Sequence, residues 1–419
     1  MLWRRFRRLR LPEDRGPLRV MFIHTEVVIG GAETLLVEII RRMDRQRFQP
    51  ELCCLKRLAA LGEVLAGEVP TFVGLLKNKY DLRVLGRLTR LLRRRRIDAV
   101  VTVGTGGDRM FWGRLAAWRA RTPVIVSALH ATGYPMRVER LNRLLAPLTD
   151  GFIGCARSHA DFLVDGEGCP ADRVFTIPNG VDVDRFHPRD KAAMRARLGI
   201  AADLPVIGIV AALRPEKQHL LLLDAMSEVV RRSPKSLLLI VGDGVERGAI
   251  EEKTRRLGLG DHVRMLGMRS DIPELLGAMD VKVLSSRMEA NPASTLEASA
   301  CGLPVVAPRV GSLAETVLDG RTGLLCEPDN PAALAAALLR MLSDPGKAQA
   351  MGAAGRELVC KRYTVEVMVR GYEGLIDGIY RAACRGERLT PAAFDRWMND
   401  VSQPSSGDIQ RISAGEPAP

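Results

Sequence analysis

Short runs of aliphatic and β-branched residues alternate with longer segments of helical periodicity through most of the 419-residue chain. The first run, at 19–24, is followed by a Gly-Gly pair and by a helical pattern from about 32 to 43. Further runs of this kind lie at 98–103, 124–127, 151–154 and 174–177. Such alternation is typical of parallel sheets that helices cover on both faces. The chain is therefore predicted to be an α/β protein with doubly wound, Rossmann-like parallel sheets.

The alternation is interrupted once and then starts again. Residues 177–188 contain two prolines and the turn-forming pair Asn179-Gly180 without periodicity, as in a connection between domains. Apolar runs return at 205–211, 237–241, 263–266, 281–284 and 304–307. A chain of this length is also too long for one ordinary core. We predict a basic N-terminal segment at 1–17, domains at 18–180 and 181–362, a C-terminal helix at 363–388 and a flexible tail at 389–419.

The net charge of +13 and the pI near 9.7 call for a negatively charged partner. Nucleic acid, an anionic membrane surface and phosphorylated small molecules all fit this charge. Aromatic residues make up only 5% of the chain, which argues against stacking on single-stranded nucleic acid, and no nucleic-acid-binding motif is present. We therefore expect no nucleic acid, and favour the membrane surface and the phosphorylated ligand.

The cysteines and the N-terminal residues indicate the cellular compartment in which the protein is expected to work. The eight cysteines include no CxxC pair and no Cys/His cluster with metal-ligand spacing, so neither a metal nor a disulfide framework is expected, and a reducing cytoplasm fits. The first residues, MLWRRFRRLRL, lack the apolar region of a signal peptide. They suit a basic amphipathic helix on anionic lipid, or equally an unstructured basic end.

Polar residues and glycines follow several of the predicted strands, where open parallel sheets bind their ligands. Gly30 and Gly31 precede a helix and would let a ligand approach its N-terminus, although a simple tight turn has the same sequence. Arg214 and Lys217 follow the first strand of the second module and could hold a diphosphate; alone, two cations are more often a solvated pair.

Two further motifs have weaker signals. Gly242 and Gly244 end a strand with GxGxxxG spacing, which disfavours a nicotinamide dinucleotide site but suits a close backbone approach to another nucleotide. His130 follows a strand and could contact a sugar hydroxyl or leaving group, whereas a lone histidine is more often structural.

The most informative stretch is EANPASTLE, residues 289–297. Asn291-Pro292 suits a turn, and a helix is expected to start near Ser294 and run through Glu297 to Ala300. Free amides near Ala293 and Ser294 would then point toward an anion. Carboxylates accept hydrogen bonds from vicinal hydroxyls, so Glu289 and Glu297 could hold hydroxylated groups on either side of a diphosphate. A nucleotide-sugar has this layout, although an isolated pair of glutamates is more often a surface feature.

The chain from 285 to 307, with Gly302-Leu303-Pro304-Val305-Val306 after the E-x7-E motif, resembles the donor site of the retaining family 4 glycosyltransferases of the GT-B fold. The resemblance continues through Gly311 to Glu315 and takes in the motifs at 30–33, 178–182, 214–217 and 242–244. It covers about residues 18 to 382. It implies an N-terminal acceptor domain, a C-terminal donor domain facing it across a cleft, and a last helix that crosses back to the first domain.

The resemblance also implies roles for single residues. Glu289 would contact hydroxyls of the donor sugar and Glu297 would hold the ribose. Arg214 and Lys217 would neutralise the diphosphate leaving group, so no metal or cofactor is needed. Gly30 and Gly31 would form the loop that closes near the donor, and His130 would lie near the sugar.

The predicted function is transfer of a hexose or N-acetylhexosamine from a nucleotide-diphosphate sugar, UDP or GDP in the first instance, to a hydroxyl acceptor with retention of configuration. The acceptor would be a glycan, glycolipid or lipid-linked precursor, used in the cytoplasm or at the inner face of the cytoplasmic membrane. The alternatives are a GT-B nucleotide-sugar 2-epimerase and a non-catalytic nucleotide-sugar-binding protein.

Overall fold

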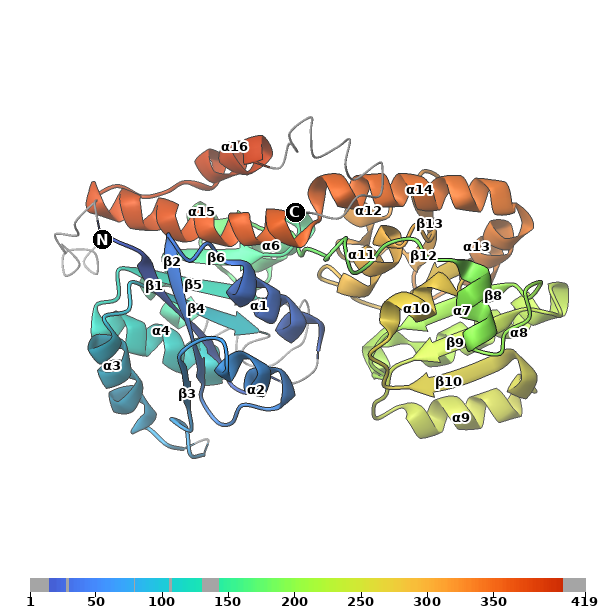
Figure 1. Cartoon of the computed structure of the whole chain (residues 1–419), viewed down its shortest axis with the longest axis horizontal. Coiled ribbons are helices and arrows are strands. Elements are labelled where there is room, and N and C mark those ends of the chain that lie inside the picture. Colours follow the sequence, from blue (N-terminus) through green and yellow to red (C-terminus); the bar gives the residue numbers. More distant parts are fainter. Residues whose placement is uncertain (1–14, 28–29, 79, 105–107, 130–142, 402–419) are drawn as a thin grey trace. The chain divides into compact units, whose positions relative to one another are not determined.

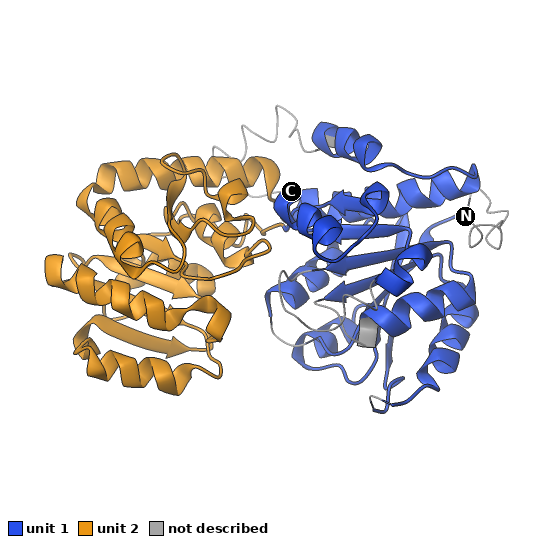
Figure 2. Cartoon of the chain, turned by 180° about the vertical axis from the view of Figure 1, so that it is seen from behind, with its two compact units in different colours: residues 1–179, 365–403 blue, residues 180–364, 404–419 orange. Residues whose placement is uncertain are grey.

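The computed structural model describes residues 15–27, 30–78, 80–104, 108–129 and 143–401 of the chain. Within this part the chain forms two compact units, shown in different colours in Figure 2. Unit 1 contains the chain up to Asn179 and the segment from Val365 onward, and unit 2 contains Gly180–Thr364. The chain thus leaves unit 1 at the predicted linker and returns to it before the last two helices.

Unit 1 is built on a seven-stranded sheet in which every strand pair is parallel (Figure 1). Its order is β3-β2-β1-β4-β5-β6-β7. The strands are β1 (Leu18–His24), β2 (Phe48–Cys54), β3 (Thr71–Val73), β4 (Ala99–Gly104), β5 (Val124–Leu129), β6 (Gly151–Gly154) and β7 (Val174–Thr176). Both faces of the central strands are buried, because crossover helices cover each side.

The helices of unit 1 form two layers. The helices are α1 (Gly31–Arg42), α2 (Ala60–Ala66), α3 (Val84–Arg95), α4 (Asp108–Ala120), α6 (Arg157–Asp165), α15 (Val365–Cys384) and α16 (Pro391–Val401), with short 3-10 turns η2 (Ala146–Leu148) and η3 (Ala171–Arg173). The apolar stripes of α1 and α15 pack on one face of the sheet in one cluster, and those of α3 and α4 pack on the other face. The basic run at the end of α3 lies at its C-terminus, where cations are favoured.

Unit 2 repeats the design with a six-stranded parallel sheet of order β10-β9-β8-β11-β12-β13. Its strands are β8 (Val206–Val210), β9 (Leu237–Val241), β10 (Val263–Gly267), β11 (Val281–Val283), β12 (Val305–Pro308) and β13 (Gly323–Cys326). Its helices are α7 (Lys191–Arg197), α8 (His219–Arg232), α9 (Arg247–Arg256), α10 (Ile272–Gly277), α11 (Ala293–Ala300), α12 (Leu313–Thr316), α13 (Pro331–Ser343) and α14 (Pro345–Arg362), with η4 (Pro215–Lys217) and η5 (Gly260–His262). The prediction of two doubly wound parallel sheets is confirmed.

Three strands, β2, β3 and β13, were not among the predicted ones. β2 carries Pro50 and two polar residues, which argue against an interior strand when read alone. In the structure Glu51 is buried because it accepts hydrogen bonds from the guanidinium groups of Arg19 and Arg95 at 2.7–3.1 Å. These long-range ion pairs allow a carboxylate inside the sheet.

The C-terminal segment differs from the prediction of a flexible tail from residue 389. Residues 391–401 form α16, which contacts α15 and β7. The reason is an apolar stripe: Phe394 and Met398 are buried, and the ring of Phe394 meets the edge of Phe175 with 5.4 Å between centroids. The helix expected to return to the first domain, α15, belongs to unit 1 and packs on α1 and β5.

None of the helices in the described part of the chain combines the length and apolarity required to cross a bilayer.

Candidate functional site

The candidate site of unit 2 lies where the strand order of its sheet reverses. β8 and β11 are neighbours, and their connections leave in opposite directions, to β9 on one side and to β12 on the other. Ligands of open α/β sheets bind beyond the carboxyl ends of the strands at such a point. The two segments that follow these strands carry Arg214 and Lys217 after β8, and Glu289 after β11. Topology therefore brings together residues far apart in the sequence.

Lys217 and Glu289 form the centre of this site. The Nζ of Lys217 lies 2.6 Å from Oε1 of Glu289, and the same oxygen accepts a hydrogen bond from Oγ of Ser286 at 2.6 Å. Glu289 is 6% exposed, so water competes little for its carboxylate. The hydroxyl of Ser285 also donates to the backbone carbonyl of Lys217 at 2.8 Å. The two strand-end segments are thus joined by side chains and backbone together.

The backbone of Glu289 packs tightly against Gly311. Gly311 has φ +50, and a Cβ placed there would lie 1.8 Å from the carbonyl oxygen of Glu289. The amide of Ser312 donates to the same carbonyl at 3.4 Å. Only glycine has both the backbone freedom and the absent side chain that this approach requires. Gly311 therefore sets the position of the Glu289 backbone.

Helix α11 begins at Ala293, with Pro292 at the N-cap, and ends at Ala300, which confirms the predicted helix. Ala293 and Ser294 occupy its first turn, where amides have no acceptor within the helix. Glu297 lies one turn further on and is half-buried. Removal from water raises the pKa of its carboxyl to about 7, against the opposing attraction of Arg185 and Lys282. Glu297 thus changes its charge near neutral pH.

Arg214 points into solvent. Its side chain is 66% exposed, and its nearest carboxylate oxygen, on Glu216, is 4.0 Å away. This guanidinium is therefore available to an anionic ligand, since surface pairs of this length contribute little.

Gly242 and Gly244 lie against the segment that carries Arg214. A Cβ at Gly242, where φ is +138, would lie 2.0 Å from the carbonyl oxygen of Ala211, and one at Gly244 would lie 2.5 Å from that of Leu213. The amide of Leu213 donates to the carbonyl of Asp243 at 3.0 Å. The two glycines thus allow two strand-end loops to pack together, a role that is independent of any ligand.

In unit 1, Gly30 and Gly31 lie at the start of α1, after β1. Neither has a positive φ, and a Cβ at Gly31 would meet nothing within 4 Å. At Gly30 a Cβ would lie 2.5 Å from Oε2 of Glu33. The fold therefore does not itself require a glycine at position 31, and an approaching ligand remains the predicted reason for it. His130 lies outside the described residues, as does most of the N-terminal segment, residues 1–14.

Three residues of the site were not predicted. Ser286 holds the carboxylate of Glu289 by a hydrogen bond. In the sequence, only its position shortly before the acidic motif could have pointed to this role. Lys282 is a charged residue within the apolar run of β11 and is fully buried, and burial lowers its pKa to about 7. Burial, with repulsion from Lys282 and Lys217, lowers the pKa of His219 to about 4, and neither of its ring nitrogens has a hydrogen-bond partner in the described part of the chain.

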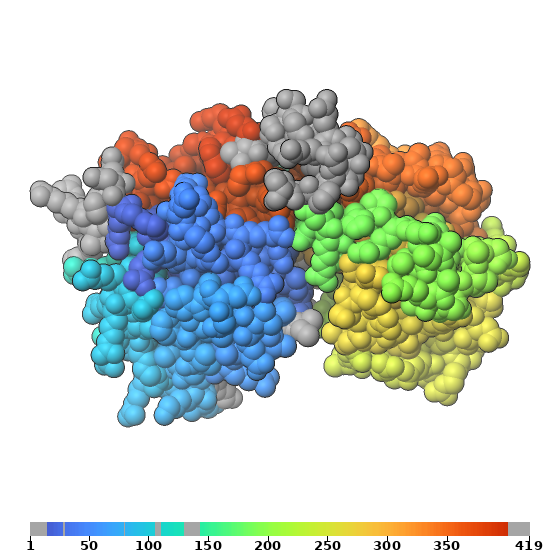
Figure 3. Space-filling model, viewed as in Figure 1, coloured from blue at the N-terminus to red at the C-terminus, as the bar shows by residue number. Residues whose placement is uncertain are grey.

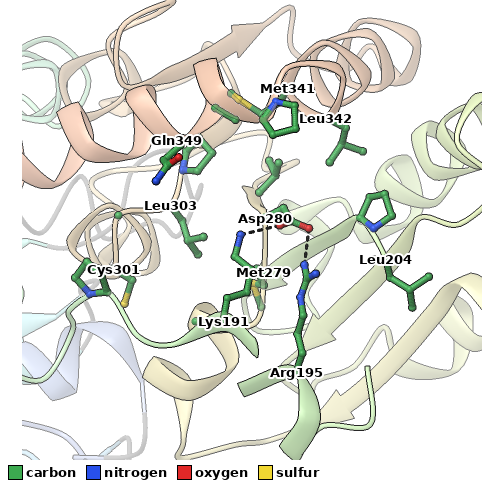
Figure 4. Close-up of a pocket in the computed structure, with 18 of the residues that line it drawn as sticks. Lys191, Arg195, Leu204, Met279, Asp280, Cys301, Leu303, Met341, Leu342 and Gln349 are labelled. Atoms are coloured by element: carbon green, nitrogen blue, oxygen red, sulfur yellow. Dashed lines mark hydrogen bonds and ion pairs between the residues drawn. The ribbon is translucent and has the colours of Figure 1, made fainter. Parts of the chain in front are cut away.

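Unit 2 also contains a cavity of about 550 Å³ at the opposite, amino-terminal edge of its sheet (Figure 4). Figure 4 shows Lys191 and Arg195 pointing toward Asp280, with nitrogen–oxygen distances of 2.8 and 2.6 Å. Both cations thus share one carboxylate of the protein itself. The carboxyl-end site carries the cluster of Lys217 and Glu289 instead, and it is the better candidate for chemistry.

Comparison with known protein families matches both units. The model described as "Glycosyl transferases group 1" matches residues 190–358, and the one described as "Glycosyltransferase Family 4" matches residues 29–185. Among the described residues no group of three or more histidine, cysteine or carboxylate side chains is arranged to hold a metal ion.

Individual glycosyltransferases are also similar to this chain in sequence or in structure. EpsF of Bacillus subtilis, named as a glycosyltransferase, is 30% identical over 69% of this chain and 78% of its own length. A D-inositol 3-phosphate glycosyltransferase of Segniliparus rotundus is 32% identical over 58% of this chain, but the match spans only 54% of that relative. In structure, HepE of Anabaena, solved with UDP and glucose, aligns with 85% of this chain and 98% of its own at 23% identity and a TM-score of 0.75.

Three findings indicate the same family: the two family models, the parallel-sheet architecture of both units and the match to EpsF. The chain therefore belongs to the group 1, family 4-like glycosyltransferases of the GT-B fold.

Proposed function

We propose that this protein transfers a hexose or N-acetylhexosamine from a nucleotide-diphosphate sugar to a hydroxyl acceptor, with retention of anomeric configuration. The observation that carries the proposal is the cluster of Lys217, Glu289 and Ser286 at the switch point of unit 2. It presents an ordered carboxylate beside a lysine at the edge where a parallel sheet binds its ligands. HepE, a neighbour in fold, was solved with UDP and glucose, which supports a UDP-sugar as the first donor to test, with a GDP-sugar next.

The proposed roles follow from the charges of these groups. Departure of a nucleoside diphosphate builds negative charge, which Lys217 and the exposed guanidinium of Arg214 would stabilise, together with the first-turn amides at Ala293 and Ser294. Glu289 would accept hydrogen bonds from hydroxyls of the sugar, and Glu297 from those of the ribose. The proposed reaction has no protein nucleophile, so attack by the acceptor on the face from which the diphosphate leaves is the working mechanism for retention.

Donor binding provides the direct test. Thermal unfolding is measured for the wild type, Arg214→Ala and Glu297→Ala with UDP-, GDP-, ADP- and dTDP-sugars. A specific donor at a hundred times its Kd is expected to stabilise the wild type by about 2.7 kcal/mol through mass action. Both variants should lose most of this shift while their midpoints without ligand stay close to that of the wild type. A panel in which no nucleotide-sugar stabilises the wild type would contradict the proposal.

The two alternatives differ in turnover. A nucleotide-sugar 2-epimerase would convert the donor without any acceptor, and a non-catalytic binding protein would be stabilised by the donor yet release no nucleoside diphosphate with any acceptor. Assaying nucleoside diphosphate release with and without a glycan or lipid-linked acceptor, together with chromatography of the nucleotide-sugar for its epimer, separates the three functions.

We further propose that the acceptor is presented at an anionic membrane surface, with α3 and α4 of unit 1 facing the lipid. α3 contains no acidic residue, and its exposed side and the C-terminal ends of both helices carry arginines. Those that are exposed and form no ion pair within the described residues are Arg83, Arg90, Arg93, Arg94, Arg96, Arg119 and Arg121. The large apolar side chains of Tyr80 and Leu82, beside the start of α3, are 77% and 72% exposed. The α3 segment lies on the surface of unit 1 in the view of Figure 3.

A protein surface that binds an anionic membrane needs arginines that are free to contact lipid headgroups and exposed apolar side chains that insert beside them. Replacing Arg83, Arg90 and Arg94 together by glutamine is expected to weaken binding to phosphatidylglycerol-containing vesicles about 100-fold at low salt, at about 1 kcal/mol for each arginine. Sedimentation with vesicles measures the effect.

A second triple variant, in unit 2, loses the same number of positive charges and serves as the matched control. Arg231, Arg232 and Arg255 of unit 2 are exposed but paired with Glu228 or Glu252. Their replacement by glutamine should leave vesicle binding nearly unchanged. Equal losses in the two triple variants would mean that only net charge matters, and binding that depends solely on residues 1–11 would move the contact to the N-terminus.

A further inference from the structure

The middle residue of β11 is a lysine that the fold buries completely. Lys282 is 0% exposed, and its Nζ donates a hydrogen bond to the carbonyl oxygen of Val283 at 2.9 Å. In the described part of the chain it forms no ion pair. Burying an ammonium group in this way is costly, and a methionine would fill a similar volume without that cost. Packing alone therefore gives no reason for a lysine at this position.

The location of Lys282 suggests a reason. Side chains alternate along a strand, and Val281 and Val283 belong to the cluster that α8 and α13 cover. Lys282 therefore lies on the opposite face, whose apolar cluster contains Leu296 and Ala298 of α11. Glu297 stands between these two residues in the sequence. Lys282 thus lies on the sheet face that α11 covers, close enough to Glu297 for their charges to interact.

The charges around both groups are few. Lys282 interacts with Glu289 and Glu297, which favour its charged form, with Lys217, which opposes it, and with the ring of His219 at the start of α8. Glu297 interacts with Lys282 and Arg185, which favour the carboxylate, and with the thiol of Cys301. Arg185 is exposed and screened by water, so its effect on the carboxylate is easily weakened by salt. Lys282 is the buried member of this set.

We propose that Lys282 is a positioning residue of the donor site: its buried ammonium keeps Glu297 as the carboxylate that accepts the hydroxyl groups of the donor's ribose. The proposal rests on the proposed function of Glu297 and adds a residue to it. A carboxylate can accept from two vicinal hydroxyls, whereas a protonated carboxyl must use one oxygen as a donor. A cation close to Glu297 therefore favours the form that binds the ribose.

The first test is donor affinity as a function of pH in Lys282→Met. The probe is the nucleotide-sugar of the UDP, GDP, ADP and dTDP panel that stabilises the wild type most, and affinity is measured by calorimetry from about pH 6 to 9. Nucleotide-sugars have no phosphate group that titrates in this range, and the uracil, guanine and thymine bases ionise only at its alkaline end, so below that end the profile reports on the protein. The pKa of Glu297 is about 7 in the wild type and is expected to lie about one unit higher in the variant. The variant should therefore bind about fivefold more weakly near pH 7 and about tenfold more weakly near pH 6, and its affinity should recover in alkali.

A double-mutant cycle then asks whether Lys282 acts through Glu297. Lys282→Met is combined with Glu297→Gln, which keeps the shape of the side chain but cannot ionise. In the Glu297→Gln background the lysine substitution should change donor affinity by less than about twofold. The same loss of affinity in that background as in the wild-type background, or an unchanged pH profile in the single variant, would overturn the proposal.

Two measurements separate this inference from its alternatives. The thermal midpoint of ligand-free Lys282→Met should equal or exceed that of the wild type, because an incompletely satisfied buried cation is removed. A ¹³C NMR titration of the Glu297 carboxyl in the ligand-free protein should place its pKa higher in the variant, by about one unit. This titration needs no donor, so an unchanged pKa overturns the inference even where the donor panel succeeds, and a failed panel with a shifted pKa contradicts only the proposed function.

Discussion

Replacing Lys217 by methionine is expected to lower kcat for sugar transfer by about 10²- to 10³-fold, the usual cost of removing one fixed group that stabilises developing negative charge. The ammonium of Lys217 is held 2.6 Å from Glu289, so it is already in place when the diphosphate departs. Methionine keeps the length of the side chain but cannot neutralise the leaving group. It also leaves Glu289, which is 6% exposed, without its cation. Steady-state kinetics with the donor identified by the thermal panel measure the effect.

Lys253 of α9 offers a matched control. Its Nζ also lies 2.6 Å from a carboxylate, that of Asp224, and its side chain is 15% exposed against 22% for Lys217. Lys253→Met should leave kcat within about twofold of the wild type, because a partly exposed ion pair away from the strand ends contributes little. A variant at Lys217 that retains full kcat would remove this residue from the proposed chemistry.

Gly311→Ala is expected to lower both the stability of unit 2 and the transfer activity. The left-handed backbone at this position costs about 1–2 kcal/mol for an L-residue, and the overlap with the carbonyl of Glu289 adds about 1–3 kcal/mol. Relief of the overlap must move the backbone that carries Glu289. We therefore expect a loss of about 2–5 kcal/mol in the free energy of unfolding together with a large loss of transfer activity. Denaturant titration and kinetics on the same preparation measure both.

Gly320→Ala isolates the first of these two costs, that of the left-handed backbone. Its φ of +72 is also left-handed, but a Cβ there would meet nothing within 4 Å. Gly320→Ala should therefore lose only the backbone cost of about 1–2 kcal/mol and keep its activity. If both alanine variants lost the same stability and the same activity, the contact between Gly311 and the Glu289 carbonyl would have no special role.

The strands and helices that the sequence predicted are those whose local pattern agrees with their surroundings. β9 and β11 are short apolar runs between turn residues, and α11 follows a turn that contains proline, so local signals in the sequence located them. β2 could not be found in this way, because Glu51 is acceptable in a strand only when Arg19 and Arg95, from other elements, surround it. The same holds for α16, whose apolar stripe has meaning only against Phe175 of β7.

The residues of the site could likewise be predicted from the sequence, whereas their contacts could not. Glu289, Glu297, Arg214 and Lys217 could be singled out because polar residues after apolar runs mark strand ends, and the order of the runs predicts parallel sheets. Their chemistry depends on contacts that no local pattern contains. The bond between Lys217 and Glu289 joins two strand-end segments that only the sheet order makes neighbours, and Ser286 owes its role to the same arrangement. The burial that brings the pKa of Lys282 and of Glu297 to about 7 arises only when helices close over the sheet, because removal from water is a property of the packed chain.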